Sequence, residues 1–334
     1  MDVTEIHLVR RPLGWPKEED FAVVRTRMRD VDDGEVHVRN EFLSVDPYMR
    51  GRMNDKRSYV APFEIGAVMD GGAIGIVEAS RSPSLRVGDR VLHRLGWRDE
   101  AIGPAHQFLR LDDDSVPATA YLGVLGSTGL TAYVGLLDIA RMIPGDVVFV
   151  SGAGGAVGSV AGQIARLRGA SKVIGSAGTA EKVAFLRDEA GFDEAFNYRE
   201  GSLVEQLAAA APEGINVMFD NVGGDHLEAA IENFCDHGRA ALCGAISHYN
   251  DIEPSPGPNN MFQIVRKRLD VHGFIITDHE DRRQAFVSEV GDWLRDGSLV
   301  ARETFVDGIE NMPEAFLGML RGQNLGKMLI RVNV

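Results

Sequence analysis

A glycine-rich segment in the middle of the chain has the residue types that hold a dinucleotide. It runs from Val147 to Gly158 and reads VVFVSGAGGAVG, and a helix-like stretch follows it. A helix N-terminus presents unpaired N–H groups and a partial positive charge, which bind phosphate. Glycines lack a Cβ, so the backbone can approach the ligand. Ala153, Gly155 and Gly158 match the pattern G-x-G-x-x-G, with alanine in the first place. Because a strand is expected before these residues and a helix after them, the pattern indicates a dinucleotide site rather than a tight turn without a ligand.

The residues after the next expected strand favour NADPH over NADH. In NAD-binding folds an Asp or Glu about 20 residues beyond the glycines binds the ribose 2′-hydroxyl. Here that region, Gly175–Thr179, reads GSAGT and has no acid. Glu181 follows but opens the next helix, where an acid favours the helix dipole. Lys182 is the candidate partner of a 2′-phosphate; a surface position on the helix is the alternative interpretation.

Two different residue patterns divide the chain near residue 122. Before it, short alternating stretches such as Glu35–Arg39 and frequent Gly and Pro indicate an antiparallel, barrel-like domain. After it, alternating strands and helices predict a doubly wound parallel sheet with helices on both faces, so the fold class is α/β. A helix over Met312–Leu320 and a strand over 327–332 are expected to return to the first domain. The expected domains are therefore 1–122 with 307–334, and 123–306.

The elements of the second domain can be assigned from the apolar runs and the glycines that end them. Strands are expected over Val147–Val150, Lys172–Ser176, Ala195–Tyr198, Val217–Asp220, Arg239–Gly244 and Leu269–Ile276. Helices are expected over Val157–Leu167, Glu181–Ala190, Leu203–Ala211, His226–Phe234 and Asp281–Arg295.

Composition excludes several classes of function. The 334 residues include 44% hydrophobic and 25% charged ones, and the net charge is −14, which argues against nucleic acid binding. The basic triplet Arg266–Arg268 is interpreted as a solvated helix face. No signal peptide or run of about 18 apolar residues is seen, so we expect no membrane span and a cytoplasmic location.

The cysteines and histidines do not have the spacing of a zinc site. The two cysteines, Cys235 and Cys243, are interpreted as buried inert thiols. Zinc alcohol dehydrogenases need a thiolate and a His-Glu pair in the first domain, but no cysteine precedes Cys235. His93 and His106 therefore lack thiolate partners, and we expect no metal.

Several segments resemble the zinc-independent medium-chain dehydrogenase/reductases, in the branch of prostaglandin, alkenal double-bond and curcumin reductases. They are 43–50 (LSVDPYMR), 123–133, 219–224 (FDNVGG), 243–250 (CGAISHYN) and 322–327 (GQNLGK). Two segments depart from the branch. The turn Gly126–Gly129 differs from the Met-Pro turn that is common in the branch. Glu100 stands where the branch often has an aromatic residue after the Trp of 96–98. Both departures concern substrate preference more than chemistry.

The resemblance implies a GroES-like β-barrel substrate domain, a Rossmann domain and a site in the cleft between them. It implies reduction by NADPH of a C=C bond conjugated to a carbonyl, in a small enone or enal. Lys182 and Tyr198 would contact the 2′-phosphate, Phe274 and Ile275 the nicotinamide, and Asn324 would bind nearby. The full expected cofactor set is Ala153, Gly155, Ala156, Val157, Gly158, Gly178, Lys182, Tyr198, Asn221, Cys243, Tyr249, Phe274, Ile275 and Asn324.

Hydride attack at the β carbon develops negative charge on the carbonyl oxygen, which needs a hydrogen-bond donor. A phenol has the right proton and keeps it at neutral pH. Tyr249 is the first candidate and Tyr48 the second, and the cofactor ribose hydroxyl is a further candidate donor. Packing alone is the alternative for each tyrosine.

Other functions remain open at this point. A quinone reductase of the same superfamily would differ in substrate, and an NADPH-binding protein without turnover would differ in activity. Members of the family often form dimers, and Leu269–Ile276 is the expected edge strand for a homodimer.

Overall fold

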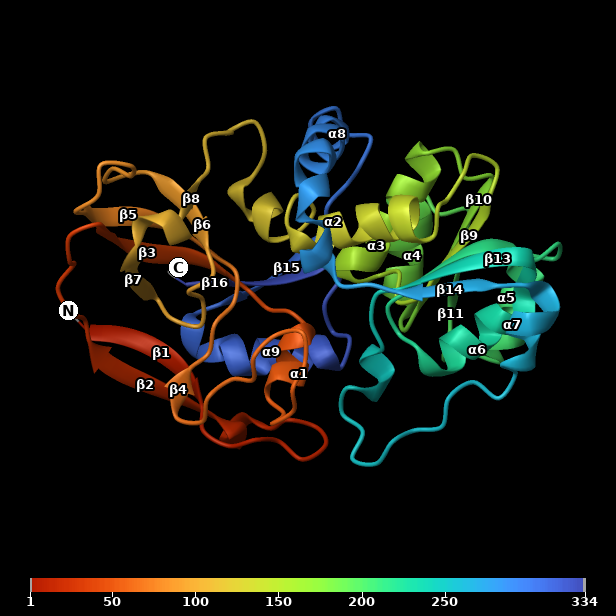
Figure 1. Ribbon diagram of the computed structural model, residues 1–334, viewed down its shortest axis with the longest axis horizontal. Helices are drawn as coiled ribbons and strands as arrows, with labels where there is room; N and C mark the ends of the chain where they lie inside the picture. The colour runs from red at the N-terminus through yellow and green to blue at the C-terminus, as the bar shows by residue number, and fades with distance from the viewer. Residues whose placement is uncertain (1, 333–334) are drawn as a thin grey trace. The chain divides into compact units, whose positions relative to one another are not determined.

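Six parallel strands form the sheet of residues 123–302, in the order β11-β10-β9-β12-β13-β14 (Figure 1). The structure is a computed structural model that describes residues 2–332. The strands are β9 (Val147–Val150), β10 (Lys172–Ala177), β11 (Glu194–Asn197), β12 (Ile215–Asp220), β13 (Phe234–Leu242) and β14 (Asp270–Gly273). In order along the chain this is the 3-2-1-4-5-6 arrangement of a Rossmann sheet, whose order reverses between β9 and β12.

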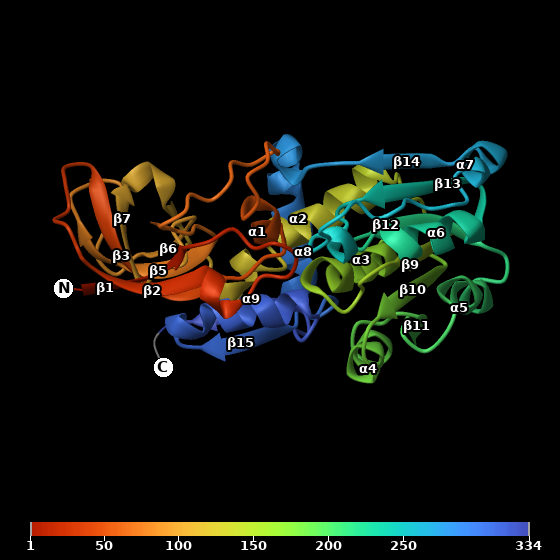
Figure 2. The same ribbon diagram turned by 90° about the horizontal axis from the view of Figure 1, so that it is seen from below.

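Helices cover both faces of this sheet. They are α2 (Ser127–Val134), α3 (Ala156–Leu167), α4 (Ala180–Asp188), α5 (Leu203–Ala210), α6 (Gly224–Asn233), α7 (Phe262–Lys267) and α8 (Arg283–Arg295). Right-handed crossovers place α3 and α4 on one face and α5 and α6 on the other, because the strand order reverses. α6 packs against both α5 and α7 (Figure 2). Phe149, Met218 and Leu207 lie fully buried in the core beneath α5 and α6.

The second unit joins residues 2–122 to 303–332. Its strands are β1 (Asp2–Leu8), β2 (Phe21–Arg27), β3 (Glu35–Ser44), β4 (Ala67–Val68), β5 (Ala73–Ser80), β6 (Arg90–His93), β7 (Glu100–Pro104), β8 (Leu109–Arg110), β15 (Glu303–Asp307) and β16 (Lys327–Arg331). Seven of them form one mixed sheet in which β16 pairs with β3, and β2, β1 and β4 form another. The helices α1 (Tyr48–Arg52) and α9 (Met312–Leu320) complete the unit. Trp97, Phe21 and Phe316 pack ring to ring in its core.

The α/β fold class is confirmed: the chain has a Rossmann sheet and a separate mixed-sheet unit. The boundary between the units lies at residue 302, a few residues before the expected one, because β15 pairs with β16 and belongs to the seven-stranded sheet. Among the described residues no helix combines the length and the apolarity that a membrane span requires.

Two local expectations were wrong. The last strand of the Rossmann sheet covers only Asp270–Gly273, because the chain bends where the Phe274 ring packs onto Phe219. Lys267 is not on a solvated face: it is buried, and its ammonium group donates to the carbonyl oxygens of Ile231 and Glu232. These carbonyls lie in the last turn of α6, where a cation is favourable.

Candidate active site

The glycine-rich turn lies between β9 and α3, at the carboxyl edge of the sheet. Gly152 adopts a φ of 58°, in the left-handed region that glycine tolerates. The next residue, Ala153, is fully buried and its N–H donates to the Ser176 carbonyl at 2.8 Å. The left-handed bend thus falls one residue before the first position of the fingerprint, so alanine is acceptable there.

Of the other two fingerprint glycines, Gly158 is needed for space. A β carbon at Gly158 would lie 2.6 Å from the Gly152 oxygen and 2.8 Å from the Ala153 Cα. Glycine at this place therefore permits α3 to pack against the turn. Gly155 precedes Ala156 and Val157 in the first turn of α3, whose N–H groups are the donors that a pyrophosphate uses.

Hydrogen bonds fix the turn at the point where the strand order reverses. The Ser151 hydroxyl donates to Asp220 at 2.6 Å and accepts from the Asn221 N–H at 2.8 Å. The Asn221 side-chain amide donates to the Ser151 carbonyl at 2.7 Å. This network joins the end of β9 to the end of β12, where open α/β sheets bind their ligands.

Lys182 lies directly beside the glycine turn. A β carbon at Gly154 would come within 3.0 Å of three carbons of the Lys182 side chain, so the lysine stem packs across the turn. Burial lowers the pKa of Lys182, and the nearby Arg199 guanidinium lowers it further. The structure thus places two positive charges at this edge, the arrangement that a phosphate dianion would neutralise.

Tyr198 lies at the end of the neighbouring strand β11. A β carbon at Gly178 would lie 2.9 Å from the Tyr198 hydroxyl oxygen, so this hydroxyl faces the Gly178 turn. The Tyr198 ring packs edge-on against His226, with ring centroids 5.0 Å apart. Burial lowers the pKa of His226 to about 4, so the imidazole is neutral at physiological pH.

Cys243 and Tyr249 lie beyond the end of β13. The Cys243 N–H donates to the Asp220 carbonyl at 2.8 Å, and burial raises the pKa of its thiol to about 12. The thiol therefore remains protonated and is no nucleophile. The Tyr249 hydroxyl returns toward this strand end: a β carbon at Gly244 would lie 3.2 Å from it.

The expected nicotinamide contacts, Phe274 and Ile275, follow β14 directly. The Phe274 ring points into the unit, against Phe219 and the backbone of Gly135. The Phe274 residue as a whole is half-buried. Ile275 precedes the 3₁₀ turns that lead to α8, and its carbonyl accepts from Asp278.

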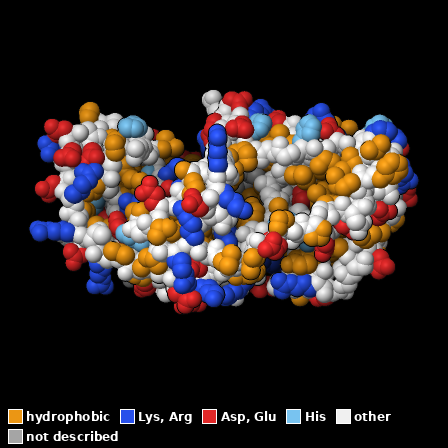
Figure 3. Space-filling view, turned by 60° about the horizontal axis from the view of Figure 1, so that its bottom comes forward, with side chains coloured by type: hydrophobic (Ala, Val, Ile, Leu, Met, Phe, Trp, Pro, Cys, Tyr) orange, Lys and Arg blue, Asp and Glu red, His pale blue; other side chains and the backbone are white. Residues whose placement is uncertain are grey.

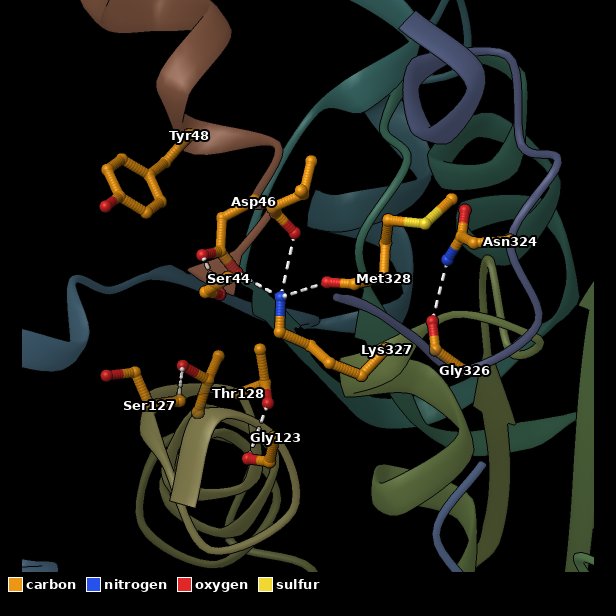
Figure 4. Close-up of polar contacts among 12 residues, drawn as sticks. Ser44, Asp46, Tyr48, Gly123, Ser127, Thr128, Asn324, Gly326, Lys327 and Met328 are labelled. Carbon is orange, nitrogen blue, oxygen red and sulfur yellow. Dashed lines mark hydrogen bonds and ion pairs between the residues drawn. The ribbon is translucent and has the colours of Figure 1, made fainter. Parts of the chain in front are cut away.

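Tyr48 stands at the first position of α1, in the unit that also contains Asn324. The turn before it is held by Lys327 (Figure 4). The Lys327 ammonium group is buried and lies 2.9 Å from Asp46, and it donates to the carbonyl of Val45 at 2.8 Å. The Ser44 hydroxyl donates to the second oxygen of Asp46. A buried charge needs such partners, so this cluster fixes the turn that positions Tyr48.

Asn324 lies in the loop before β16 and is buried. Its amide donates to the Gly326 carbonyl at 2.7 Å (Figure 4). The side chain is therefore held in one orientation, which leaves its carbonyl oxygen as the group that a ligand could meet.

Two histidines and the unusual acid of the β-sheet unit have structural partners, whereas His106 is exposed. Glu100 is buried and lies 2.6 Å from His37. His93 lies 2.9 Å from the Asn40 side chain and accepts from the Leu95 N–H. Among residues 2–332 no group of three His, Cys, Asp or Glu side chains is arranged to hold a metal ion.

Three functional candidates were missed by the sequence analysis: Arg199 beside Lys182, Lys327 beneath the Tyr48 turn, and Arg94, which donates to the Tyr48 hydroxyl at 3.3 Å. Arg199 could have been found, since it follows Tyr198 directly. The other two contacts depend on strand pairing between distant segments, which spacing alone does not indicate.

Comparison with known proteins agrees with this geometry. Residues 4–111 match the N-terminal domain of oxidoreductase, and residues 156–290 match the zinc-binding dehydrogenase domain. The chain is 40% identical to the NADPH-dependent curcumin reductase of Escherichia coli, over 97% of this chain and 95% of that protein. It is 38% identical to the NADP-dependent 2-alkenal reductase of Nicotiana tabacum, over 96% and 94% of the two chains.

A solved structure is equally similar. CurA of Vibrio vulnificus, crystallised in complex with NADPH, superimposes with a TM-score of 0.94 at 41% identity and covers 99% of both chains. Both domain matches and the full-length relatives agree on one assignment. The chain belongs to the medium-chain dehydrogenase/reductase family, in the branch of curcumin, 2-alkenal and prostaglandin reductases.

Proposed function

We propose that this protein is an NADPH-dependent reductase of the C=C bond in α,β-unsaturated ketones and aldehydes, and that it needs no zinc. The observation that carries this proposal is the full-length similarity to a curcumin reductase and a 2-alkenal reductase. Both named substrates have a C=C bond conjugated to a carbonyl.

The residues of the glycine turn fit NADPH. Glycine at 158 lets the N-terminus of α3 pack directly against the turn, and the end of β10 has no acid that would repel a 2′-phosphate. Lys182 and Arg199 supply positive charge at the same edge. These features support binding of the pyrophosphate at α3 and of the 2′-phosphate beside Lys182.

When bound, NADPH supplies the hydride that reduces the β carbon of the substrate. The protein's own part is to stabilise the negative charge that grows on the carbonyl oxygen. Tyr249 is our first candidate for this hydrogen bond and Tyr48 the second. Burial and the Asp46 carboxylate raise the pKa of Tyr48 above that of a free phenol, so this hydroxyl donates without losing its proton.

The proposal is tested by measuring NADPH consumption with trans-2-alkenals, enones, dienones such as curcumin, and ortho- and para-quinones, each repeated with NADH. We expect the highest kcat/KM with the conjugated carbonyl compounds and NADPH. Preference for quinones would instead identify a quinone reductase. Binding of NADPH without any turnover across this panel would identify a non-catalytic protein.

Zinc independence is tested separately. Activity should be unchanged after dialysis against a chelator, and elemental analysis of the active protein should find less than stoichiometric zinc. Loss of activity on chelation, with recovery on adding zinc, would contradict this part of the proposal.

We also propose that the protein forms a homodimer in the cytoplasm. Strand β14 is the edge of its sheet, and an uncovered edge favours pairing. In the preceding helix α7, Phe262 and Val265 are 75% and 68% exposed. Figure 3 shows hydrophobic side chains gathered on the surface of the Rossmann unit. The free cysteines Cys235 and Cys243 are in keeping with a reducing compartment.

A further inference from the structure

The hydroxyl of Tyr48 has a cationic neighbour. Arg94 follows β6 directly, and its Nη2 atom lies 3.3 Å from the Tyr48 oxygen. A guanidinium group has donors only and no acceptor. The Tyr48 oxygen must therefore accept this hydrogen bond, and its own proton points toward another acceptor.

Four charged groups lie near the Tyr48 hydroxyl, and they differ in their other partners. Two carboxylates affect this hydroxyl, those of Asp46 and Asp70, and both raise the pKa of Tyr48. Each already has another basic partner, since Asp46 pairs with Lys327 and Asp70 with Arg52.

The two remaining charges near the phenol are cationic. Arg94 and Arg52 lower the pKa of Tyr48, and Arg94 has the larger effect of the two. Arg94 is the one whose guanidinium donates to the hydroxyl itself. Arg52 instead engages Asp70 and lies over the Phe63 ring.

The backbone on both sides of Arg94 is fixed although its side chain is exposed. The Arg94 carbonyl accepts from the Gly71 N–H at 3.1 Å. The preceding His93 is held by Asn40 and by the Leu95 N–H. The guanidinium therefore reaches Tyr48 from a turn whose backbone is held by hydrogen bonds.

We propose that Arg94 is a positioning residue for the reductase reaction: it directs the Tyr48 proton toward the carbonyl oxygen of the substrate and strengthens that hydrogen bond as the enolate charge develops. The inference rests on the proposed function and specifies how the second candidate phenol works. No proton leaves Tyr48 in this step, since the phenol only donates a hydrogen bond. A hydrogen-bonded chain with a charged member is stronger than its neutral counterpart.

The kinetic test is a double-mutant cycle of Arg94→Met and Tyr48→Phe with a small enone, measured in four proteins. We expect Arg94→Met to lower kcat by about tenfold with little change in the KM of the enone, because the contact matters most in the transition state. Arg94→Lys should restore part of this loss. In the Tyr48→Phe background, Arg94→Met should have no further effect.

A matched control separates this effect from a general loss of positive charge. Arg86 precedes β6, whereas Arg94 follows it, so the two arginines lie at opposite ends of the strand. Arg86→Met makes the same charge change on an exposed side chain and should leave kcat unchanged. An equal loss in both variants would overturn the proposal.

A second readout needs neither cofactor nor turnover. The chain has six tyrosines, so ring-labelled ¹³C-tyrosine gives six Cζ resonances, and Tyr48→Phe assigns the one of interest. Arg94→Met should shift this resonance at neutral pH and Arg94→Lys should shift it less. An unmoved resonance, or an Arg94→Met loss that persists in the Tyr48→Phe background, would refute the role of Arg94. Failure of the wild-type protein to reduce any enone would instead refute the proposed function.

Discussion

Lys182 is the residue whose replacement tests the cofactor assignment most directly. Its stem packs across Gly154 in the glycine turn, and Arg199 lies close enough to lower its pKa. Lys182→Ala removes both the charge and the packing. Lys182→Met removes the charge but keeps a stem of similar length, and Lys182→Arg keeps the charge.

The size of the effect follows from the one interaction that is lost. A charge-assisted hydrogen bond contributes about 1.5–3 kcal/mol, and ~1.4 kcal/mol is a factor of ten in affinity. We therefore expect the KM for NADPH to rise about tenfold to about a hundredfold in Lys182→Ala. The rise should be smaller than the loss of two charges would give, since Arg199 remains. NADH has no 2′-phosphate, so its KM should stay the same.

Steady-state kinetics with both cofactors at a saturating enone concentration measure this difference, and fluorescence titration gives the Kd without turnover. Lys182→Met should behave as Lys182→Ala does, whereas Lys182→Arg should remain close to the wild type. Equal weakening of NADH and NADPH would mean that the stem supports the turn and that the charge is irrelevant. Unchanged kinetics in all three variants would remove Lys182 from the site.

Three further outcomes are expected. Tyr249→Phe should lower kcat with a small enone by at least about tenfold, because water replaces the phenol only in part; wild-type turnover would defeat this assignment. The pKa of His226 is lowered to about 4 in the folded protein but is about 6.5 in an unfolded chain, so stability falls as the pH drops from 6.5 toward 4. At pH 5 this lowers the free energy of unfolding by about 2 kcal/mol. Urea titrations at pH 7.5 and pH 5 should therefore show a smaller change in the free energy of unfolding for His226→Phe than for the wild type. An equal change in both proteins would contradict this. Sedimentation should show a dimer that Phe262→Lys weakens, and a wild-type monomer would rule the dimer out.

The Rossmann unit could be predicted from the sequence because its signals are local. The buried strand over Val147–Val150, the glycines and the following helix all appear in one short segment. Even the alanine in the fingerprint is explained once Gly152 is seen to take the left-handed bend. The Lys182 position, too, was predictable, since it depends on a helix start only a few residues after a strand end.

Other features depend on contacts between distant segments. Lys327 meets Asp46 only because β16 pairs with β3, and no spacing in the sequence indicates that pairing. Lys267 is a similar case. Its charge predicted a solvent-exposed side chain, but the carbonyl groups at the end of α6 accept hydrogen bonds from it inside the fold. The inward turn of Phe274 likewise depends on Phe219, which belongs to a different strand.

The pairing of β16 with β3 has a consequence for how the chain matures during synthesis. All residues of the Rossmann unit lie before Glu303 in the chain, so its six strands are made before β15 and β16. The first 122 residues, although made earlier, lack β15, α9 and β16 until residues 303–331 have been added. Until then β3 has β5 on one side and β7 beside residues 35–39 on the other, and residues 42–44, which pair with β16, still lack that partner.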